Sequence, residues 1–407
     1  MSNKPKAALG FIFITLLIDV IGFGVIIPVV PALIMELING EVSDASLYGG
    51  VLTFSYAIMQ FIFSPILGGL SDKYVRRPVI LISLFGFAMD YLLVAWAPTL
   101  VWLFVARIIS GICGASMTTA SAYIADISEP EKRAQNFGLI GVAFGLGFII
   151  GPIIGGFLGE YGSRIPFLAA AGLAFINWIY GFFILPESLA KENRREFSWK
   201  RANPLGSLFQ LKKYPIILGL IASLFFVHFA AHSTQSIWTY YTIFKFDWNP
   251  KMIGMSLGFV GLMVALVQGV LIRKIIPIIG EQNSIYTGLS LYLIGFLLFA
   301  FATDGWMMFV FSIPYALSGL SGPSMQSIMT KQVAADSQGE LQGAITSVIS
   351  LTAAMAPPIM TGLFYTFTQK EAPIFFPGAP FFLGALLTIV SIILARRSLT
   401  RHHPRHN

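Results

Sequence analysis

Twelve apolar runs, each long enough to cross a lipid bilayer, constrain this chain more than any other feature of its sequence. A helix that spans the hydrocarbon core needs about 20 apolar residues. The runs cover approximately residues 8–37, 47–70, 78–97, 99–124, 136–159 and 164–185, and then 215–244, 252–273, 284–303, 305–328, 342–368 and 377–396. Because 56% of the 407 residues are hydrophobic and only 11% are charged, the sequence predicts an all-α, polytopic membrane protein and excludes a soluble domain.

The basic residues indicate the topology. Most of the 26 Lys and Arg residues fall in loops on the same side as the N-terminus. The exceptions are Arg107, inside a run, and the residues on the other side: Arg164, Lys245, Lys251 and Lys370. Since cytosolic loops are enriched in Lys and Arg, we expect both termini to be cytosolic. The net charge of +7 therefore follows the membrane boundary, and no nucleic-acid partner is expected.

A charged, proline-containing segment divides the twelve runs into two sets of six. We predict an N-terminal six-helix lobe over residues 1–186, a cytosolic linker over 187–214, and a second lobe over 215–407 that ends in a short basic tail. Gly138 precedes Pro152 by fourteen positions, and Gly343 precedes Pro357 by the same number. This matched spacing favours duplication into two pseudo-symmetric lobes. The alternative is a coincidence between glycine-rich helices.

Three ionisable residues lie deep within apolar runs of the first half. Asp19 lies in the first run, Asp90 in FGFAMDYLLVAW of the third, and Arg107 in WLFVARIISG of the fourth. A charge in hydrocarbon costs about 3 kcal/mol or more, so such residues pair with one another or face a water-filled cavity. Two carboxylates near one arginine can release and regain a proton when their pairing changes. The alternative, strongest for Arg107, is a structural ion pair that fixes helix orientation.

The seventh run has one polar face instead of a deep carboxylate. His228, His232 and Gln235 recur at helical spacing in FFVHFAAHSTQSIWTYYT. Histidines four residues apart serve zinc in helical motifs, but no third ligand lies nearby in the sequence, so no metal is expected. A protonation site, a polar cavity wall and a pair of structural histidines all remain possible. We predict a substrate cavity lined by polar and aromatic side chains: Gln60, His228, His232, Gln235 and Trp238.

Two further motifs admit a functional and a structural interpretation. The loop GGLSDKYVRRP contains Gly68, Asp72, Arg76 and Arg77; it is either a charged latch at the cytosolic face or an ordinary positive loop. The fifth run contains FGLGFIIGPIIGGFLG, in which small residues recur around a proline. Its candidate residues, Gly147, Gly151, Pro152, Gly155 and Gly156, allow close helix packing or form a gate.

The chain resembles the tetracycline/proton antiporter group of the major facilitator superfamily over most of its length. The resemblance rests in the first half on DVIGFGVIIPVVP, GGLSDKYVRRPV, the Asp90–Tyr91 pair, ARIISGICGA, AYIADISEPEKRAQNFG, GFIIGPIIGG and FILPES. In the second half it rests on NPLGSLF, FATDGWM and QGELQGAITSVISLTA. The resemblance implies the major facilitator fold, with twelve transmembrane helices in two six-helix lobes.

The resemblance also implies roles for the motif residues. Asp19 and Asp90 would handle substrate and protons, and Arg107 would be the arginine associated with proton coupling. The loop from Gly68 to Arg77 would be the cytosolic gate, and the glycines around Pro152 would be the antiporter signature.

The chain departs from the group at three positions. Val75 stands where the gating loop normally has glycine. The tetracycline exporters carry a histidine in the eighth span and an aspartate in the ninth, where an ungapped alignment places Val264 and Tyr292. The proton-coupling half thus resembles the group more closely than the substrate half.

We therefore expect a monomeric, proton-coupled transporter of the cytoplasmic (inner) membrane that exports amphipathic organic compounds or drugs and uses no cofactor. The alternative is a proton-coupled importer of a metabolite, nutrient or siderophore on the same fold. A membrane sensor is a third possibility, but the chain lacks the appended domain that would mark one. No nucleophile–base set or cofactor loop is evident, so no enzymatic activity is expected.

Overall fold

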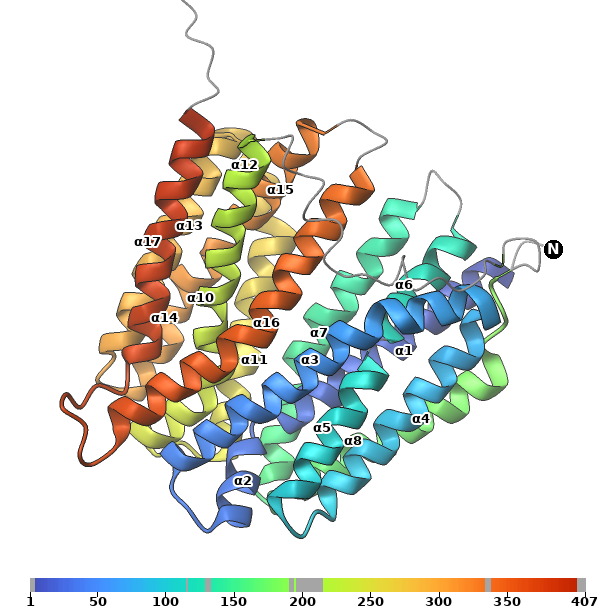
Figure 1. The fold of residues 1–407 in the computed structure, drawn as a ribbon, viewed down its shortest axis with the longest axis horizontal. Helices are drawn as coiled ribbons and strands as arrows, with labels where there is room; N and C mark the ends of the chain where they lie inside the picture. The colour runs from blue at the N-terminus through green and yellow to red at the C-terminus, as the bar shows by residue number, and fades with distance from the viewer. Residues whose placement is uncertain are drawn as a thin grey trace, which may run out of the picture. The chain divides into compact units, whose positions relative to one another are not determined.

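Every regular element of the described chain is a helix (Figure 1). The computed structural model describes residues 4–114, 116–128, 133–189, 194, 215–333 and 338–400; most of the predicted linker lies outside them. The chain forms two compact units. Unit 1 comprises Met1–Glu41, Ser55–Asn203 and Trp248–Gly261, and unit 2 comprises Val42–Phe54, Pro204–Asp247 and Leu262–Asn407. The division into two lobes of six consecutive helices remains a prediction.

Unit 1 contains most of the first half of the chain. Its helices are α1 (Lys4–Ile26), α2 (Val30–Ile38), the part of α3 (Val42–Tyr74) after Phe54, α4 (Arg76–Ala95), α5 (Leu100–Gly114), α6 (Ser116–Ile127), α7 (Arg133–Gly159), α8 (Ile165–Ile184) and the part of α11 (Pro250–Leu266) up to Gly261. Helix α1 packs against α7 and α8, and α4 packs against α5 and α8.

Unit 2 contains the remaining helices. They are the first part of α3, α10 (Pro215–Phe246), the end of α11, the π-helix η4 (Val267–Leu271), α12 (Ile272–Ile279), α13 (Glu281–Phe301), α14 (Gly305–Leu317), the 3₁₀-helix η5 (Ser318–Leu320), α15 (Ser321–Lys331), α16 (Gln338–Thr368) and α17 (Ala379–Thr400). Helix α10 packs against α16 and α17, and α13 packs against α17 and α14.

The observed helices confirm the predicted all-helical membrane architecture. Within the described residues, eleven helical segments are long and apolar enough to cross a membrane. The predicted tenth span, 305–328, is not among these eleven. It consists of α14, η5 and α15 in direct succession, each shorter than a membrane span. Pro314 and the following SGLSGP sequence explain this division, because proline and glycine interrupt regular α-helical hydrogen bonding.

The predicted first span, 8–37, is wrong in its second part. Helix α1 ends at Ile26, a turn follows, and α2 begins at Val30. In the turn the N–H groups of Ile27 and Val29 donate to carbonyls three residues back, at 3.3 and 3.1 Å. Pro28 has no N–H to donate and its ring crowds the preceding turn, so a regular helix cannot continue through it.

Large apolar side chains cover the outside of the helices. Ile82, Phe183 and Ile278 are 71%, 79% and 81% exposed, and many other large hydrophobic residues are more than one-third exposed. Soluble proteins rarely expose continuous apolar surface of this extent. Contact with lipid accounts for it, which agrees with the predicted membrane spans.

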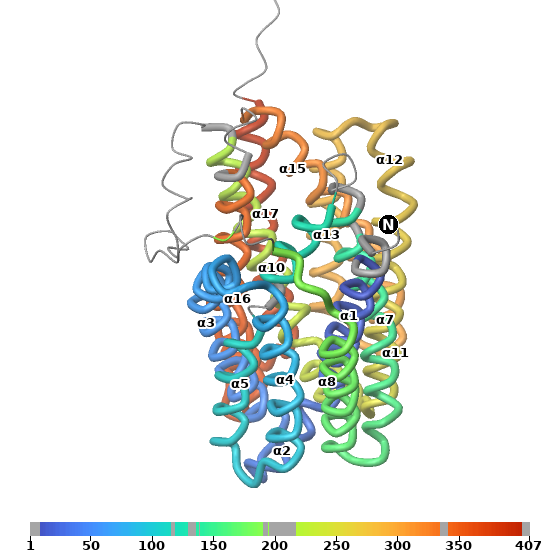
Figure 2. The backbone as a smooth tube through the Cα atoms, turned by 90° about the vertical axis from the view of Figure 1, so that its right-hand side faces the viewer, coloured from blue at the N-terminus to red at the C-terminus, as the bar shows by residue number. Residues whose placement is uncertain are grey.

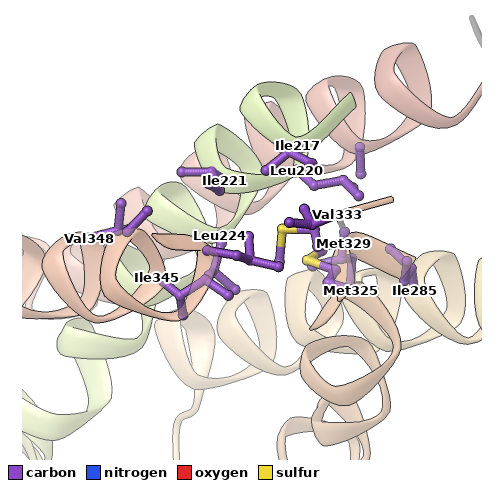
Figure 3. Close-up of a cluster of buried hydrophobic side chains, with 14 residues drawn as sticks. Ile217, Leu220, Ile221, Leu224, Ile285, Met325, Met329, Val333, Ile345 and Val348 are labelled. Carbon is purple, nitrogen blue, oxygen red and sulfur yellow. The ribbon is translucent and has the colours of Figure 1, made fainter. Parts of the chain in front are cut away.

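A buried apolar cluster joins five elements of unit 2 (Figure 3). Ile217, Leu220, Ile221 and Leu224 project from one face of α10, because residues three and four apart lie on the same side of a helix. They meet side chains of α13, α15, α16 and α17: Ile285, Leu289, Met325, Met329, Leu341, Ala344, Ile345, Val348 and Ala395. Val333, just after α15, completes the cluster. The flexible methionine side chains fill the space between the helices.

Glycines allow α1 and α7 to touch backbone to backbone in unit 1 (Figure 2). A Cβ on Gly155 would lie 1.9 Å from the carbonyl oxygen of Val25. A Cβ on Gly151 would lie 2.7 Å from the carbonyl oxygen of Ile21 and 2.8 Å from Cα of Gly24. Close packing of small residues is a main source of helix association in lipid, where helices gain nothing by leaving an apolar solvent.

An ion pair joins α2 to the loop between α7 and α8. The Arg164 guanidinium donates to Oε1 of Glu36 from Nε and Nη2, at 3.2 and 3.1 Å, and to the carbonyls of Ala95 and Ala97 from Nη1. The Ser163 hydroxyl donates to Oε2 of Glu36 at 2.6 Å. The Ser163 hydrogen bond and Arg164 lower the pKa of the Glu36 carboxyl despite its partial desolvation. These contacts place α2 beside the end of α4.

The junction between α3 and α4 contains a strained residue. Val75 has φ 113° and ψ 151°, a left-handed conformation that glycine adopts readily and a β-branched residue does not. Its N–H donates to the carbonyl of Ser71 at 3.2 Å, so the backbone geometry is held by the end of α3. The departure from glycine noted in the sequence therefore occurs at a position where the backbone favours glycine.

Substitution of Gly155 tests the contact between α1 and α7. We expect Gly155→Ala to lower stability by about 1–3 kcal/mol, because a methyl group cannot fit against the Val25 backbone. Gly145→Ala in the same helix is the control; its Cβ would meet nothing within 4 Å, and alanine favours a helix. Thermal unfolding in detergent measures both variants, and equal melting temperatures would contradict the packing interpretation.

Substitution of Val75 tests the strained junction. We expect Val75→Gly to stabilise the protein, because relief of about 1–3 kcal/mol of strain exceeds the roughly 0.5–1 kcal/mol that glycine costs in the unfolded chain. Val79→Gly, at a helical position of α4, should instead destabilise it. Melting temperatures provide the measurement; a lower value for Val75→Gly than for the parent would show that no strain is stored there.

Candidate functional site

The structure brings Asp90 and Arg107 together as a buried ion pair. Helices α4 and α5 pack side by side, and Nη2 of Arg107 donates to Oδ2 of Asp90 at 3.0 Å. The Asp90 side chain is 0% exposed and that of Arg107 is 17% exposed. Oδ1 of Asp90 has no hydrogen-bond partner among the described residues. The pair neutralises a charge that would otherwise be costly in an apolar span.

Asp19 has an amide partner instead of a cation. Nδ2 of Asn177, on α8, donates to Oδ1 of Asp19 at 3.1 Å and to the carbonyl of Thr15 at 3.1 Å. Asn177 is completely buried, whereas Asp19 retains some accessible surface. The two candidate carboxylates of unit 1 therefore have different environments: one is enclosed with an arginine, and the other is held by a neutral donor.

Two tyrosines lie near both carboxylates. Tyr56 of α3 and Tyr91 of α4 each interact electrostatically with Asp19, Asp90 and Arg107. Tyr91 also lies against α1, since a Cβ on Gly22 would be 3.6 Å from its ring. The predicted proton-coupling residues thus form one cluster that joins α1, α3, α4, α5 and α8.

Gln60 lies at the edge of this cluster. Its Nε2 donates to the carbonyl of Gly114, at the end of α5, at 3.3 Å. The side chain is half-buried. Gly114 also lies close to Tyr56, because a Cβ there would be 2.7 Å from the tyrosine hydroxyl. Gln60 is therefore within unit 1 and close to the carboxylate cluster.

Arg76 organises the junction between α3 and α4. Its Nη1 donates to Oγ of Ser71 at 2.7 Å and to Asp72, and its Nε donates to Oδ2 of Asp126, on α6, at 3.1 Å. The Ser71 hydroxyl donates in turn to the carbonyl of Gly68. The predicted latch residues thus form a network that ties α3, α4 and α6 together.

Glu187 extends this network from the segment after α8. Its Oε1 accepts the N–H of Arg76 and its Oε2 accepts the N–H of Arg77, both at 3.0 Å. These are free donors at the first turn of α4, where an anion is favourable. The Arg77 side chain turns away and donates to the carbonyl of Phe182 at 2.6 Å.

Close packing accounts for the glycines around Pro152. Gly147, Gly151 and Gly155 face α1. Gly156 faces α11, where a Cβ would lie 2.6 Å from the carbonyl oxygen of Pro250 and 3.0 Å from Cα of Gly254. A Cβ on Gly151, Gly155 or Gly156 would displace a neighbouring backbone, and one on Gly147 would lie 2.6 Å from the Val20 side chain. Whether they also form a gate remains a prediction.

The candidate cavity residues of α10 differ in their exposure. His228 and His232 lie one turn apart and are half-buried, and Gln235 is exposed. Trp238 is different: its side chain is 2% exposed and its ring packs edge-on against Phe299, with ring centroids 5.2 Å apart. Trp238 belongs to the core of unit 2 in this structure and presents no surface to a ligand.

Tyr292 is in an aromatic group. Its ring centroid lies 4.4 Å from that of Phe296 and 5.3 Å from that of Tyr315. Tyr292 and Tyr315 are also linked by a side-chain hydrogen bond. Val264 is half-buried near the end of α11. Within the described ranges no group of three or more His, Cys, Asp or Glu residues could hold a metal ion.

Three polar partners were not assigned roles from the sequence: Asn177, Asp126 and Glu187. Each had a visible signal. Asn177 interrupts the apolar run GLAFINWIYGFF, and the other two lie in the quoted segments AYIADISEP and FILPES. Their functions depend on partners 50 to 158 residues away in the chain, which spacing alone does not identify.

The chain is similar to known proteins over nearly its whole length. The tetracycline resistance protein, class C, of Escherichia coli is 37% identical over 394 residues, which cover 97% of this chain and 98% of that protein. The class H protein of Pasteurella multocida is 34% identical, with 96% of each chain covered. The crystal structure of the human organic anion transporter MFSD10 (TETRAN) superposes with a TM-score of 0.71 at 22% identity, covering 96% of this chain and 99% of that one.

The chain also matches the model of a protein family. The Major Facilitator Superfamily model matches residues 12–357, which contain all of the first-half candidate residues and most of the second half. The resemblance predicted from the sequence motifs is thereby confirmed. Eleven long apolar helices, a divided twelfth and buried charges within the spans are the expected features of such a membrane transporter. The chain belongs to the Major Facilitator Superfamily.

Proposed function

We propose that this protein is a proton-coupled antiporter that exports amphipathic organic compounds from the cytosol. The cluster of Asp19, Asp90 and Arg107 within membrane-spanning helices carries the proposal. An ionisable group at this depth is a liability for folding unless its charge is used. The names of the curated relatives, tetracycline resistance proteins, support export of a drug-like compound.

Protonation of a carboxylate in the cluster drives the proposed cycle. A proton from outside neutralises a carboxylate and favours one orientation of the transporter, and substrate from the cytosol displaces the proton and favours the other. A membrane potential supplies about 2.3 kcal/mol per charge for each 100 mV. This is enough to bias an equilibrium between two conformations that differ by a few kcal/mol.

The substrate differs from a metal–tetracycline complex in this proposal. Val264 and Tyr292 stand where the resemblance implies a histidine and an aspartate, and Tyr292 is enclosed by aromatic rings. An apolar and aromatic environment with few charges suits a planar amphipathic molecule better than a bound cation. His228, His232 and Gln235 are the polar contacts we propose for unit 2, and Gln60 is the one we propose for unit 1.

The proposal also covers the oligomeric state, the topology and the gate. The protein acts as a monomer in the cytoplasmic (inner) membrane with both termini in the cytosol, and it performs no enzymatic reaction. Two pseudo-symmetric six-helix lobes alternate access to the substrate. The Arg76 network, with Asp72 and Glu187, acts as the cytosolic gate because it joins three helices and the segment after α8 through charged hydrogen bonds.

Transport in everted vesicles tests the function. With the interior acidified, addition of a substrate should release protons. We expect Asp19→Asn to abolish this response because its amide cannot carry the proton, and Asp90→Asn to abolish it because Arg107 loses its counter-ion. Asp304→Asn, in the loop before α14, is the control and should respond like the parent. A pH-sensitive dye follows the gradient during addition of drugs and tetracyclines. Proton-linked uptake of a metabolite in right-side-out vesicles, with no response in everted ones, would establish an importer instead.

The buried ion pair has its own test. Arg107→Leu should destabilise the protein by about 3–5 kcal/mol, because it leaves the enclosed Asp90 carboxylate without a counter-ion. Adding Asp90→Asn to that variant should restore much of the loss, since no uncompensated charge remains. Thermal unfolding of the two single variants and the double variant measures the coupling. Additive effects of the two substitutions would show that the pair contributes nothing.

A further inference from the structure

We propose that Asn177 is a positioning residue that holds the protonated form of Asp19 through a two-point amide–carboxylic acid pair. In this pair Nδ2 of Asn177 donates to one carboxyl oxygen, and the O–H on the other oxygen donates to Oδ1 of Asn177. The inference rests on the proposed proton-coupled function and extends it, because it assigns the exchanged proton to Asp19 and a role to a residue outside the family motifs.

The first observation is the existing half of the pair. Nδ2 of Asn177 lies 3.1 Å from Oδ1 of Asp19, which is a normal hydrogen-bond length. The second N–H of the same group is used by the carbonyl of Thr15, also at 3.1 Å. Both donors of the amide are therefore occupied, and the orientation of the amide plane relative to α1 is determined.

The second observation is the unsatisfied half. Oδ1 of Asn177 is fully buried and has no hydrogen-bond partner in the part of the chain that the structure describes. A buried amide oxygen without a donor costs roughly 1–3 kcal/mol, and such groups are rare. An ionised carboxylate cannot supply the missing donor, because it only accepts hydrogen bonds. A protonated carboxyl can supply it, since its two oxygens match the spacing of the amide nitrogen and oxygen.

The third observation is the contrast with Asp90. Its Oδ2 accepts a hydrogen bond from the Arg107 guanidinium, a permanent cation that balances the charge of that carboxylate. Asp90 is also 0% exposed, whereas Asp19 retains accessible surface through which a proton can exchange. The geometry therefore separates the two carboxylates into a charged partner for arginine and an exchangeable proton site.

Few other charged or titratable groups face Asp19 from the neighbouring helices. Tyr56 and Tyr91 interact with it electrostatically, and they interact in the same way with the ion pair of Asp90 and Arg107. Helices α7 and α6 also pack against α1. The sequence of α7 from Asn136 to Gly159 contains no ionisable residue. On α6, Tyr123 donates to the carbonyl of Pro186, and Asp126 accepts from Arg76.

A double-mutant cycle tests the pair in the full-length protein without any transport assay. In Asp19→Asn, the new amide can make the same two hydrogen bonds with Asn177 at every pH. We therefore expect this variant to melt at the same temperature as the parent at acid pH and about 2–4 °C higher at alkaline pH, where the parent carboxyl loses its proton. In the Asn177→Leu background, the part of this increase in melting temperature that comes from the pair should disappear.

Infrared spectroscopy reports on the hydrogen bonds of the carboxyl group directly. The carbonyl stretch of the protonated Asp19 side chain is identified by its loss in Asp19→Asn. We expect this band to move to higher frequency in Asn177→Leu, because the carboxyl group loses hydrogen bonds. Thr15→Val is the matched control: it removes a buried hydroxyl that has no partner and keeps the backbone carbonyl that binds Asn177. If Thr15→Val moves the band and Asn177→Leu does not, the proton is held by the threonine hydroxyl and the proposal is overturned.

Transport separates positioning from a merely structural role. In proteoliposomes, Asn177→Leu should reduce proton-driven export by about tenfold, while exchange of substrate across the membrane, which needs no net proton movement, should change much less. Equal losses in both assays would indicate a structural role and would overturn the proposal. If no substrate is exported, the proposed function fails, and the thermal and infrared measurements still decide whether Asn177 holds the proton on Asp19.

Discussion

The absence of water from the bilayer core is the constraint on which this structure depends. Every backbone polar group in a span must be satisfied within the protein, and helices achieve this locally. Apolar side chains then give little reason for helices to associate, so cohesion comes from close backbone approach and from polar pairs. The contact of Gly155 with the Val25 carbonyl is an example of the first, and the Asp90–Arg107 pair is an example of the second.

The same constraint gives the two buried carboxylates unequal chemistry. Asp90 is enclosed with a permanent cation, so its charge is balanced by a direct partner. Among the described residues, Asp19 pairs with the neutral amide of Asn177 and with no cation, so its charge is not balanced by a direct partner there. Helix α5 supplies Arg107 to Asp90, and helix α8 supplies Asn177 to Asp19. These partners are the basis for the proposed roles of Asp90 as a counter-ion and Asp19 as the exchange site. The difference arises from partners in the fold and not from the residues themselves.

Hydropathy predicted most of the membrane spans to within a few residues, because the requirement for about 20 apolar residues is local. It failed where a local interruption mattered: Pro28 ends α1 early, and the Gly- and Pro-containing segment after Pro314 divides the tenth span. The charged motif residues of unit 1 could be selected from the sequence because charges in hydrocarbon are conspicuous, and their roles stay predictions. Asn177 was not selected because a neutral amide is less conspicuous. The burial of Trp238 was not predicted, because helical periodicity does not say whether an aromatic side chain faces the protein core or a ligand.

The close contact between α1 and α7 limits how protonation of Asp19 can act. Because the backbones of Gly24 and Gly151 touch, α1 cannot approach α7 further when the charge on Asp19 changes. Asn177 offers a different route, since its amide binds both the Asp19 carboxylate and the Thr15 carbonyl and so connects α1 to α8. The segment after α8 carries Glu187, which binds the N-terminus of α4 beside the strained Val75. Hydrogen bonds and the chain itself therefore connect Asp19, through α8 and the segment after it, to the junction between α3 and α4.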